Sequence, residues 1–529
     1  MPCIGVRALK WECFEMDLTR RAALQLAGTA CASLASGWGS ALAAADAFGP
    51  ETVIAKAREL AGKPYVGPGE ALPESLKGLS YDDFRRINFR TDRTLLRDGG
   101  SNFGLQLFHR GSIFKHQARV NLVANGVVKP LFYSPDLFDF GDRGAPQNLP
   151  TSLGFAGIRL LYPLNHSGKM DELAAFLGAS YFRFLGKGQH YGLSARGLSL
   201  GSGGPGEEFP DFVEFWVETP EAGQGSIAVH ALLDGPSVTG AYRFTFEPGT
   251  GDDVDVQATL FARKDLKEMG LAPLTSMFLY GENTLNRPPD FRPEVHDSDG
   301  LAIQSEGGEW LWRPLRNPTR NSVANFFSKD IKGFGLIQRD RAFGNYQDLE
   351  ALYDKRPGYW VEMKNRLGQG RVVLVELHSN AETDDNVVAS WVPDIQPKAG
   401  SETQISYVIH AVSGPLHQGG QVYATFETHN AAATSAGKPN VTRFLIDFVG
   451  DRLGDVTLDV SKIELVIWGS SGTVSAPVVV ANPAINGVRA SFDAEPPPGE
   501  DIDLRAFLRM GSETLTETWT YRLDSTQPA

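Results

Sequence analysis

The chain has 529 residues, 42% of them hydrophobic, and its 63 acidic and 50 basic side chains give a formal net charge of −13. This length allows two or three domains, each large enough to bury a core. The acidic balance argues against a nucleic-acid-binding protein, because such proteins present a basic face to the phosphates. Short apolar runs between 57 glycines and 32 prolines favour a β-rich fold.

Residues 1–45 have the layout of a cleaved export signal. Arg20 and Arg21 precede an Ala-rich apolar run, and small residues at 40–45 offer more than one cleavage site. Paired arginines before a weakly hydrophobic run are typical of the twin-arginine export route. The run is too short to span a bilayer. The sequence therefore predicts a periplasmic protein, with Met1 or Met16 as its start.

No metal or other cofactor is expected. The three cysteines, Cys3, Cys13 and Cys31, all lie in the predicted leader, so the mature chain would have neither disulfides nor thiol sites. Zinc-binding His and Glu spacings are missing from the sequence. The Asp-x-Asp-Gly fragment at 297–300 lacks the remainder of a calcium loop.

The mature chain begins with helical patterns at 50–60 and 80–87, and then changes to a period of two from about Asn102. Two alternating runs at 118–124 and 127–133 flank Asn-Gly, which predicts a β-hairpin. Further strands are expected at 212–217, 227–233, 242–246 and 254–261, with short helices at 170–177 and 346–354. These elements predict a large antiparallel β-sandwich over residues 46–392.

A second domain is expected after a linker at 393–401, where prolines and a glycine cluster with polar residues. Short strand patterns then recur at 405–411, 422–428, 442–448, 463–468, 478–481, 488–492, 502–508 and 516–523. About eight short strands in this length are typical of an immunoglobulin-like sandwich. The sequence therefore predicts a smaller C-terminal sandwich over residues 402–529.

The densest mixture of aromatic, acidic and arginine side chains lies between Arg292 and Trp391. Sugar rings stack their apolar faces on aromatic rings, and their hydroxyls need donors and acceptors. The candidates for substrate binding are Trp310, Trp312, Arg313, Tyr346, Tyr353, Trp360 and Asp299. Taken singly, the aspartates also fit turns, and Trp310 and Trp312 also fit exposed strand positions or the core. Arg313 and Arg316 also fit a surface ion-pair network. The pattern indicates a saccharide site without specifying a reaction.

Several longer segments resemble the periplasmic glucan biosynthesis proteins of the G and D type. They are residues 48–50, 81–87, 132–135, 274–278, 292–300, 312–315 and 385–386, and the leader is more similar to the D branch. The resemblance implies a galactose-mutarotase-like N-terminal sandwich beside the immunoglobulin-like one. It also implies an enzyme that acts on the β-1,2-linked backbone of osmoregulated periplasmic glucans, as an inverting endo-β-1,2-glucanase or a transglycosylase.

The resemblance also implies roles for individual residues. Asp385 would be the general acid and Asp297 the general base, acting through ordered water, with Asp299 as the alternative base. Tyr353 would hold the substrate or the water chain. The segment 429–438 is either a plain loop or a lid over the glucan.

The expected partners are linear β-1,2-glucan, the inner-membrane glucan synthase and a second copy of the chain. The competing hypothesis is a non-catalytic glucan-binding protein that controls backbone structure during synthesis. An epimerase acting on monosaccharides is disfavoured by the size of the polar and aromatic cluster.

Overall fold

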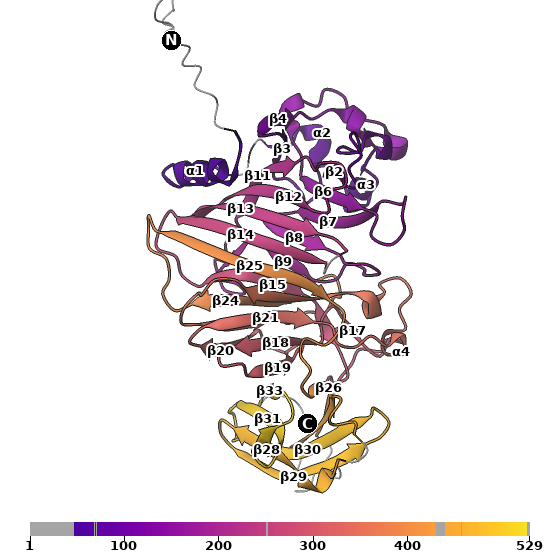
Figure 1. Cartoon of the computed structure of the whole chain (residues 1–529), viewed down its shortest axis with the longest axis vertical. Helices are drawn as coiled ribbons and strands as arrows, with labels where there is room; N and C mark the ends of the chain where they lie inside the picture. Colours follow the sequence, from indigo (N-terminus) through magenta and orange to yellow (C-terminus); the bar gives the residue numbers. More distant parts are fainter. Residues whose placement is uncertain are drawn as a thin grey trace, which may run out of the picture. The chain divides into compact units, whose positions relative to one another are not determined.

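The computed structural model describes residues 47–525, apart from 68, 70, 250–251, 430–439 and 456–457. The predicted leader and nearly all of the segment 429–438 lie outside these residues. Strands dominate the described chain, which confirms the prediction of a mainly β protein (Figure 1). None of the helices within these residues has the length and apolar composition to cross a bilayer.

Two large sheets and one smaller sheet make up the framework. The first has ten strands: β2 (Gly104–Phe108), β6 (Gly157–Tyr162), β7 (Asp171–Leu177), β8 (Tyr181–Phe184), β9 (Ser194–Arg196), β15 (Met269–Ser276), β24 (Val387–Pro393), β23 (Gly370–Glu376) and β20 (Ser322–Ser328) in spatial order, with β10 (Leu198–Leu200) also paired to β15. Its final strand, β20, is paired on one side only, with β23.

The second sheet has fifteen strands and extends further. In spatial order they are β28 (Ile463–Gly469), β31 (Ile502–Met510), β33 (Thr518–Leu523), β19 (Trp310–Pro314), β18 (Gly300–Ser305), β21 (Ile331–Ile337), β22 (Gly358–Met363), β25 (Glu402–Val412), β14 (Asp253–Ala262), β13 (Val238–Glu247), β12 (Ile227–Asp234), β11 (Asp211–Glu218), β3 (Arg119–Ala124) and β4 (Val127–Leu131), with β32 (Glu513–Thr514) paired to β31. Strand β33 joins β19 in parallel and β31 in antiparallel fashion. One sheet therefore runs through both predicted domains.

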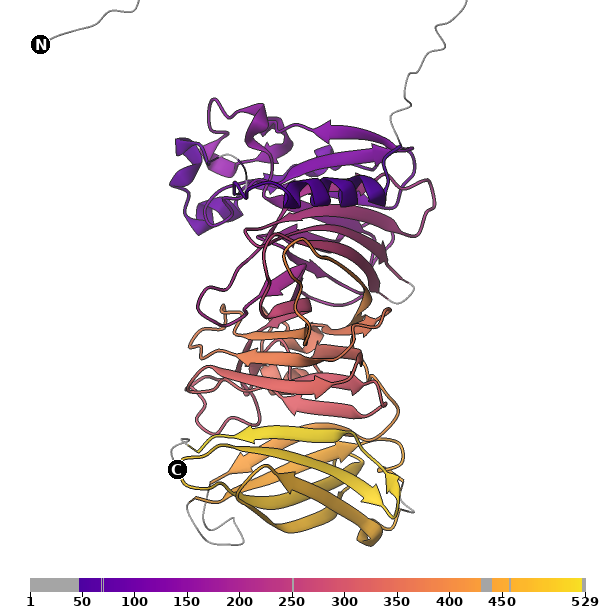
Figure 2. The ribbon, with the colours of Figure 1, turned by 90° about the vertical axis from the view of Figure 1, so that its left-hand side faces the viewer.

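The remaining elements are a smaller sheet, two strand pairs and the helices. A four-stranded sheet contains β26 (Gln421–Thr428), β27 (Thr442–Val449), β30 (Gly487–Glu495) and β29 (Thr473–Asn482), and two strand pairs are β1 (Asn88–Phe89) with β5 (Phe138–Asp139) and β16 (Phe278–Tyr280) with β17 (Val295–His296). The α-helices are α1 (Pro50–Ala61), α2 (Glu74–Lys77), α3 (Tyr81–Arg85) and α4 (Phe343–Tyr346), and the 3-10 helices are η1 (Thr91–Arg93), η2 (Pro135–Leu137), η3 (Gly141–Arg143), η4 (Thr151–Leu153), η5 (Tyr353–Lys355) and η6 (Val460–Lys462). Helix α1 packs on β12, β13 and β14 (Figure 2).

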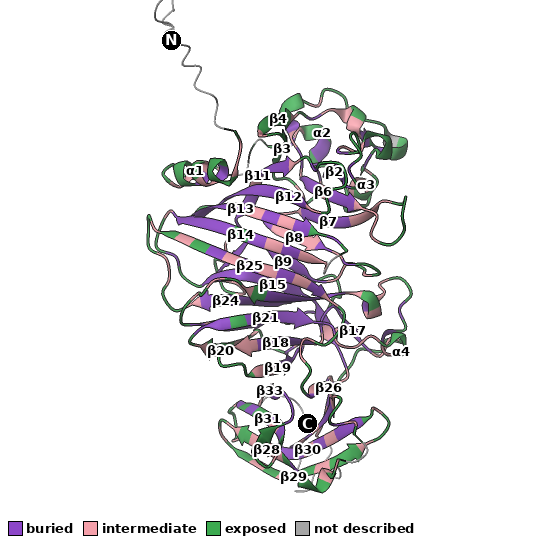
Figure 3. Ribbon diagram, in the orientation of Figure 1, coloured by how far each residue is buried: buried purple, intermediate pink, exposed green. Residues whose placement is uncertain are grey.

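The main hydrophobic core lies between the two large sheets. Strands such as β12 and β13 are buried along most of their length (Figure 3). Phe176, Phe182 and Phe244 form a cluster of ring contacts between strands of both sheets. Burial of aromatic side chains of this size contributes strongly to the hydrophobic stabilisation of a fold.

Local patterns predicted most strands correctly. The hairpin of β3 and β4 turns at Asn125 and Gly126, whose φ angles of 51° and 76° are those of a type I′ turn. Two helices predicted from the sequence are not found in the structure. Residues 170–177 form strand β7, because β6 and β8 pair with it on both sides and a buried apolar run fits either structure.

The second predicted helix, at 346–354, does not form: α4 ends at Tyr346, and the 3-10 helix η5 begins at Tyr353. Gln347 and Leu352 have positive φ angles, which interrupt a right-handed helix. The Asp348 carboxylate accepts hydrogen bonds from the backbone N–H groups of Glu350 and Ala351. Such side-chain bonds to the backbone compete with helical hydrogen bonding.

The predicted domain boundary also needs correction. Residues 402–412, assigned to the second domain, form β25, which pairs with β14 and β22 in the large sheet. The preceding segment is packed rather than free, because the Gly400 N–H donates to the Ala262 carbonyl. The chain therefore passes to the C-terminal sandwich after Val412.

Candidate active site

Asn386 fastens the segment that carries Asp385 to strand β16. Its buried side chain accepts a hydrogen bond from the Phe278 N–H at 2.9 Å and donates to the Phe278 carbonyl at 3.0 Å. It also donates to the Leu377 carbonyl, and its own backbone carbonyl accepts from the Leu377 N–H. The side-chain amide thus bonds to the backbone of β16 as a neighbouring strand would, and it fixes the position of Asp385 beside β16.

Strand β17 brings Asp297 to the same place. Phe278 pairs with His296, and the Asp297 N–H donates to the Met277 carbonyl at 2.8 Å. The Asp297 side chain is 6% exposed and forms an ion pair with Arg356. Burial raises the pKa of Asp297; Arg356 opposes this, and the negative charge of Asp385 adds to it. The Asp385 carboxyl group therefore lies close enough to affect the ionisation of Asp297.

Asp385 lies in the wall of a cavity of about 380 Å³. Its side chain reaches solvent, yet protein atoms crowd the carboxyl, and this desolvation is the main cause of its raised pKa. The cations of Arg183 and Arg196 oppose the rise, and neighbouring Asp384 adds to it. The cavity wall also includes Phe114, His116, Tyr181, Arg183 and Asp211. This size and mixed lining are typical of a small-molecule or oligosaccharide site.

Tyr353 lies beside Asp297. Its ring is stacked under the Arg356 guanidinium at 4.2 Å, and its hydroxyl donates to Glu382 at 3.4 Å. Glu382 in turn pairs with Arg292 at 2.7 Å. Burial raises the pKa of Tyr353, so its phenol stays protonated and can donate or relay a proton. Tyr346, which was predicted to bind substrate, is fully buried behind it, with the ring centroids 5.9 Å apart.

Asp299 belongs to a different group. Its carboxylate accepts hydrogen bonds from the backbone N–H groups of Arg339 and Asp340, and it lies 3.5 Å from His296. His296 is also 2.9 Å from Glu294. Burial disfavours protonation of His296, but the hydrogen bond with Glu294 and the charges of Asp299 and Glu294 outweigh it and raise the pKa to about 9.

Glu294, His296 and Asp299 place their ligand atoms within 4.8 Å of one another, which is the spacing of a metal site. A protonated imidazole has no lone pair for a metal ion. Its positive charge offsets one of the two carboxylate charges, and the backbone N–H groups of Arg339 and Asp340 stabilise the Asp299 carboxylate. The three residues are therefore explained as a buried ion cluster that supports β17 behind Asp297.

The tryptophans predicted to bind sugar lie in a different place. Trp312 and Trp360 are 3% and 7% exposed and belong to the hydrophobic core shared with the C-terminal sandwich. Trp310 packs on Trp360 and on His417, with ring centroids 5.1 Å and 4.6 Å apart. The Arg339 guanidinium covers Trp312 at 3.5 Å. Trp312 and Trp360 therefore join the two sandwiches as core residues, which corrects the expectation that they contact substrate. Trp310 is only partly buried and packs against the same core, and its role in substrate binding stays a prediction.

Arg313 and Arg316 are likewise structural. Arg313 is 2% exposed and pairs with the buried Glu376 at 3.2 Å. Arg316 accompanies it and also pairs with Asp524 at 2.9 Å. Of the two alternatives weighed for these arginines, the ion-pair network is the one found. It is buried rather than at the surface.

Replacing Trp312 with Ala tests this reassignment. Removal of a buried indole is expected to lower the free energy of unfolding by about 3–5 kcal/mol, because a cavity remains where the two sandwiches meet. Chemical denaturation would measure the loss. An unchanged stability together with weaker glucan binding would instead return Trp312 to the substrate site.

Sequence reasoning missed several residues of the site. Arg356, which holds Asp297, and Arg183 and Arg196, which act on Asp385, had no role assigned. In the strand pattern around Arg183 an arginine alternates with aromatic residues, which places its charge on the opposite face of the strand from the rings. Nothing local connects it to Asp385, because the two belong to strands distant in sequence.

The fold and this site define a protein of two joined β-sandwiches with an aspartate pair at an oligosaccharide-sized cavity. The family model described as periplasmic glucan biosynthesis protein, MdoG, matches residues 48–523. The chain therefore belongs to the MdoG family of periplasmic glucan biosynthesis proteins. The family's description agrees with the predicted periplasmic location, whereas the twin-arginine route stays a prediction.

Curated relatives support the same family. The glucans biosynthesis protein G of Vibrio cholerae serotype O1 is 44% identical over 483 residues, which is 90% of this chain and 86% of the relative. The G proteins of Shewanella frigidimarina and Rhodopseudomonas palustris are also 44% identical, over 90% of this chain and 84% and 93% of their own lengths. These relatives carry the G designation, and the likeness to the D branch stays a prediction.

Proposed function

We propose that this protein is an enzyme of glucan biosynthesis that cleaves or transfers the β-1,2-linked glucose backbone with inversion. The observation that carries the proposal is the pair Asp385 and Asp297: both carboxyl groups have raised pKa values, and the charge of Asp385 contributes to the rise at Asp297. Inverting glycosidases need one protonated carboxyl at the leaving oxygen and one carboxylate that activates the attacking group. Membership of a glucan biosynthesis family supports the choice of substrate class.

In this proposal Asp385 is the general acid. It is the member of the pair that lines the cavity, so a glycosidic oxygen bound there can reach it. Its raised pKa keeps a fraction of the carboxyl protonated at higher pH than for an ordinary aspartate. Donation of that proton to the glycosidic oxygen lets the leaving sugar depart as a neutral alcohol.

Asp297 is the general base in the same proposal, and it acts through a relay. Its side chain is buried behind Tyr353 and Arg356, so an attacking water or sugar hydroxyl passes its proton along the Tyr353 hydroxyl and ordered water. The ion pair with Arg356 favours the carboxylate form of Asp297, which is the form that accepts a proton. Water as acceptor gives hydrolysis, and a sugar hydroxyl gives transglycosylation.

Asp384 offers a test of the acid through pH. Its negative charge raises the pKa of Asp385, so Asp384→Asn is expected to lower that pKa. Activity that needs protonated Asp385 is lost as the pH rises through this pKa, and the alkaline limb of the pH–rate profile should move to lower pH. Arg183→Met removes an opposing cation and should move the same limb to higher pH. If the alkaline limb moves in the same direction in both variants, the assignment of Asp385 as the general acid is contradicted.

The central experiment is incubation of the purified protein with linear β-1,2-glucan, followed by sizing of the products and identification of their linkages. We expect shorter or cyclised β-1,2-glucans. The anomeric configuration, followed by NMR at early times, should show inversion. Products that retain the configuration would contradict the separate roles of acid and base.

A second candidate is a glucan-binding protein without turnover that controls backbone structure during synthesis. The observation that favours it is the ion pair between Asp297 and Arg356, which holds the base away from solvent. Binding of linear β-1,2-glucan without any change in its length or linkage would select this candidate.

A further inference from the structure

The two large sheets end at different places, and a pocket lies where the shorter one stops. The ten-stranded sheet ends at β20, whereas the fifteen-stranded sheet continues from β18 and β19 through β33 and β31 to β28. Within the described residues, the shorter sheet has no further strand beyond β20. A cavity of about 420 Å³ occupies this position, between residues of β20 and residues of the C-terminal strands. We call it the sheet-end pocket.

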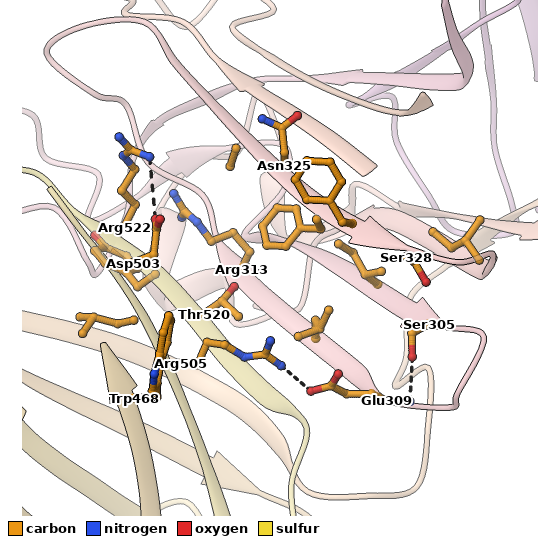
Figure 4. Close-up of a pocket in the computed structure, with 18 of the residues that line it drawn as sticks. Ser305, Glu309, Arg313, Asn325, Ser328, Trp468, Asp503, Arg505, Thr520 and Arg522 are labelled. Atoms are coloured by element: carbon orange, nitrogen blue, oxygen red, sulfur yellow. Dashed lines mark hydrogen bonds and ion pairs between the residues drawn. The ribbon is translucent and has the colours of Figure 1, made fainter. Parts of the chain in front are cut away.

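Aromatic side chains stand on both sides of the sheet-end pocket. Trp468, on the terminal strand β28, is 55% exposed, and Phe327, on β20, is 73% exposed. Figure 4 shows Trp468 and Asn325 on opposite sides of the pocket, with Arg313 and Thr520 between them. Large aromatic side chains left this open carry a hydrophobic cost, and together with polar neighbours they mark binding surfaces.

The polar lining is rich in hydrogen-bonding groups and balanced in charge. Each arginine of the pocket has a carboxylate partner: Arg505 pairs with Glu309 at 2.6 Å, Arg522 with Asp501 at 2.8 Å, and Arg313 with Glu376 at 3.2 Å. A phosphate or an acidic peptide would need an unpaired cation. A neutral ligand with many hydroxyls needs donors and acceptors of both kinds, and it needs no net charge.

A pyranose ring has these two properties, because its apolar face stacks on an indole and its hydroxyls bond to polar groups around the rim. The pocket is large enough for such a ligand, since small-molecule sites occupy about 300–1,000 Å³. The backbone that carries the indole is fixed, because Trp468 pairs across the strands with Arg505, whose guanidinium is held by Glu309. A ligand would therefore need little rearrangement of the backbone on binding.

We propose that the sheet-end pocket is a second binding site for a neutral glucan chain, with Trp468 as its stacking platform. It is distinct from the Asp385 cavity, whose lining residues belong to other strands. The choice of β-1,2-glucan as ligand rests on the proposed function. Two sites on one protein raise the apparent affinity for any chain long enough to occupy both.

The test uses the full chain with Asp385→Asn, so that the ligand is not consumed during titration. Calorimetric titration with a short linear β-1,2-gluco-oligosaccharide is expected to show two binding sites per chain. Adding Trp468→Ala should leave one site, and Trp468→Phe should retain the second with roughly tenfold weaker affinity, because a smaller ring still stacks. Tyr423→Ala removes a similarly exposed aromatic residue outside the pocket and should change nothing.

A second readout locates the ligand directly. Fluorotryptophan incorporated into the protein gives one fluorine NMR signal for each tryptophan, and Trp468→Phe identifies the signal of Trp468. The oligosaccharide should shift that signal, and Asn325→Ala, on the opposite wall, should weaken the shift. Heparin, a polyanion, should leave the signal unchanged.

Failure of this inference differs from failure of the proposed function. One binding site per chain, with a Trp468 signal that the oligosaccharide leaves unchanged, would overturn the second site even if linear β-1,2-glucan is cleaved. A Trp468-dependent second site in a protein that never alters the glucan would support the inference and overturn only the catalytic proposal. A shift caused by heparin but not by the glucan would show that the pocket takes an anionic ligand and would also overturn the inference.

Discussion

Asp385→Asn is expected to lower turnover of linear β-1,2-glucan by about 100- to 10,000-fold, which is the usual contribution of a general acid. The amide has almost the same shape as the carboxyl group but does not protonate the glycosidic oxygen. Because Asp385 lies in the cavity wall and Asn386 independently anchors its segment, the substituted protein should fold and bind glucan normally. Reducing-end release measures the rate, and titration calorimetry measures the binding.

The matched control is Asp384→Asn, which removes the neighbouring charge without removing the proposed acid. Asp384 accepts a hydrogen bond from the Ser379 hydroxyl at 2.8 Å and holds a turn. Its loss should shift the pH profile and leave substantial turnover near the optimum. If Asp385→Asn retains the wild-type rate, or if both variants lose the same activity, Asp385 is not the acid.

Asp297→Asn is the second large effect, with an expected loss of about 100-fold or more in turnover. The amide cannot accept the proton that arrives through Tyr353, so the acidic limb of the pH–rate profile should disappear along with most of the rate. Removal of one partner from the ion pair with Arg356 should also lower the stability, because that guanidinium is left without its carboxylate. Thermal unfolding separates the two effects.

Asp299→Asn serves as the control for the choice of base. Its carboxylate accepts backbone hydrogen bonds from Arg339 and Asp340 and stands beside His296, so its loss should reduce stability. At temperatures where the variant is folded, its pH profile should keep both limbs. If Asp299→Asn loses the acidic limb and Asp297→Asn keeps it, Asp299 is the general base and Asp297 is not.

Local sequence patterns predicted the strands well and their partners poorly. The Asn-Gly turn and the alternating runs depend on neighbouring residues, so they can be read without the fold. The apolar run at 171–177 fits a helix or a strand, and only pairing with β6 and β8 decides between them. In the same way, the alternation at 402–412 predicts a strand but does not indicate which sheet it joins.

The candidate site was predictable in part, and the reasons are physical. Family motifs named Asp297 and Asp385, and the structure brings their segments together around Phe278. The tryptophan pattern was ambiguous, because a core between two sandwiches needs large aromatic side chains as much as a sugar site does. Arg356 and Arg183 were missed because the contacts that matter for them arise only after distant strands pair.

The position of β33 has a consequence for how the protein folds. This strand lies in the interior of the fifteen-stranded sheet, between β19 and β31. Until β33 has paired, the edge of β19 carries unpaired N–H and C=O groups, and that edge is open to pairing with other chains. Docking of this one strand therefore both closes the longer sheet and protects the molecule from aggregation.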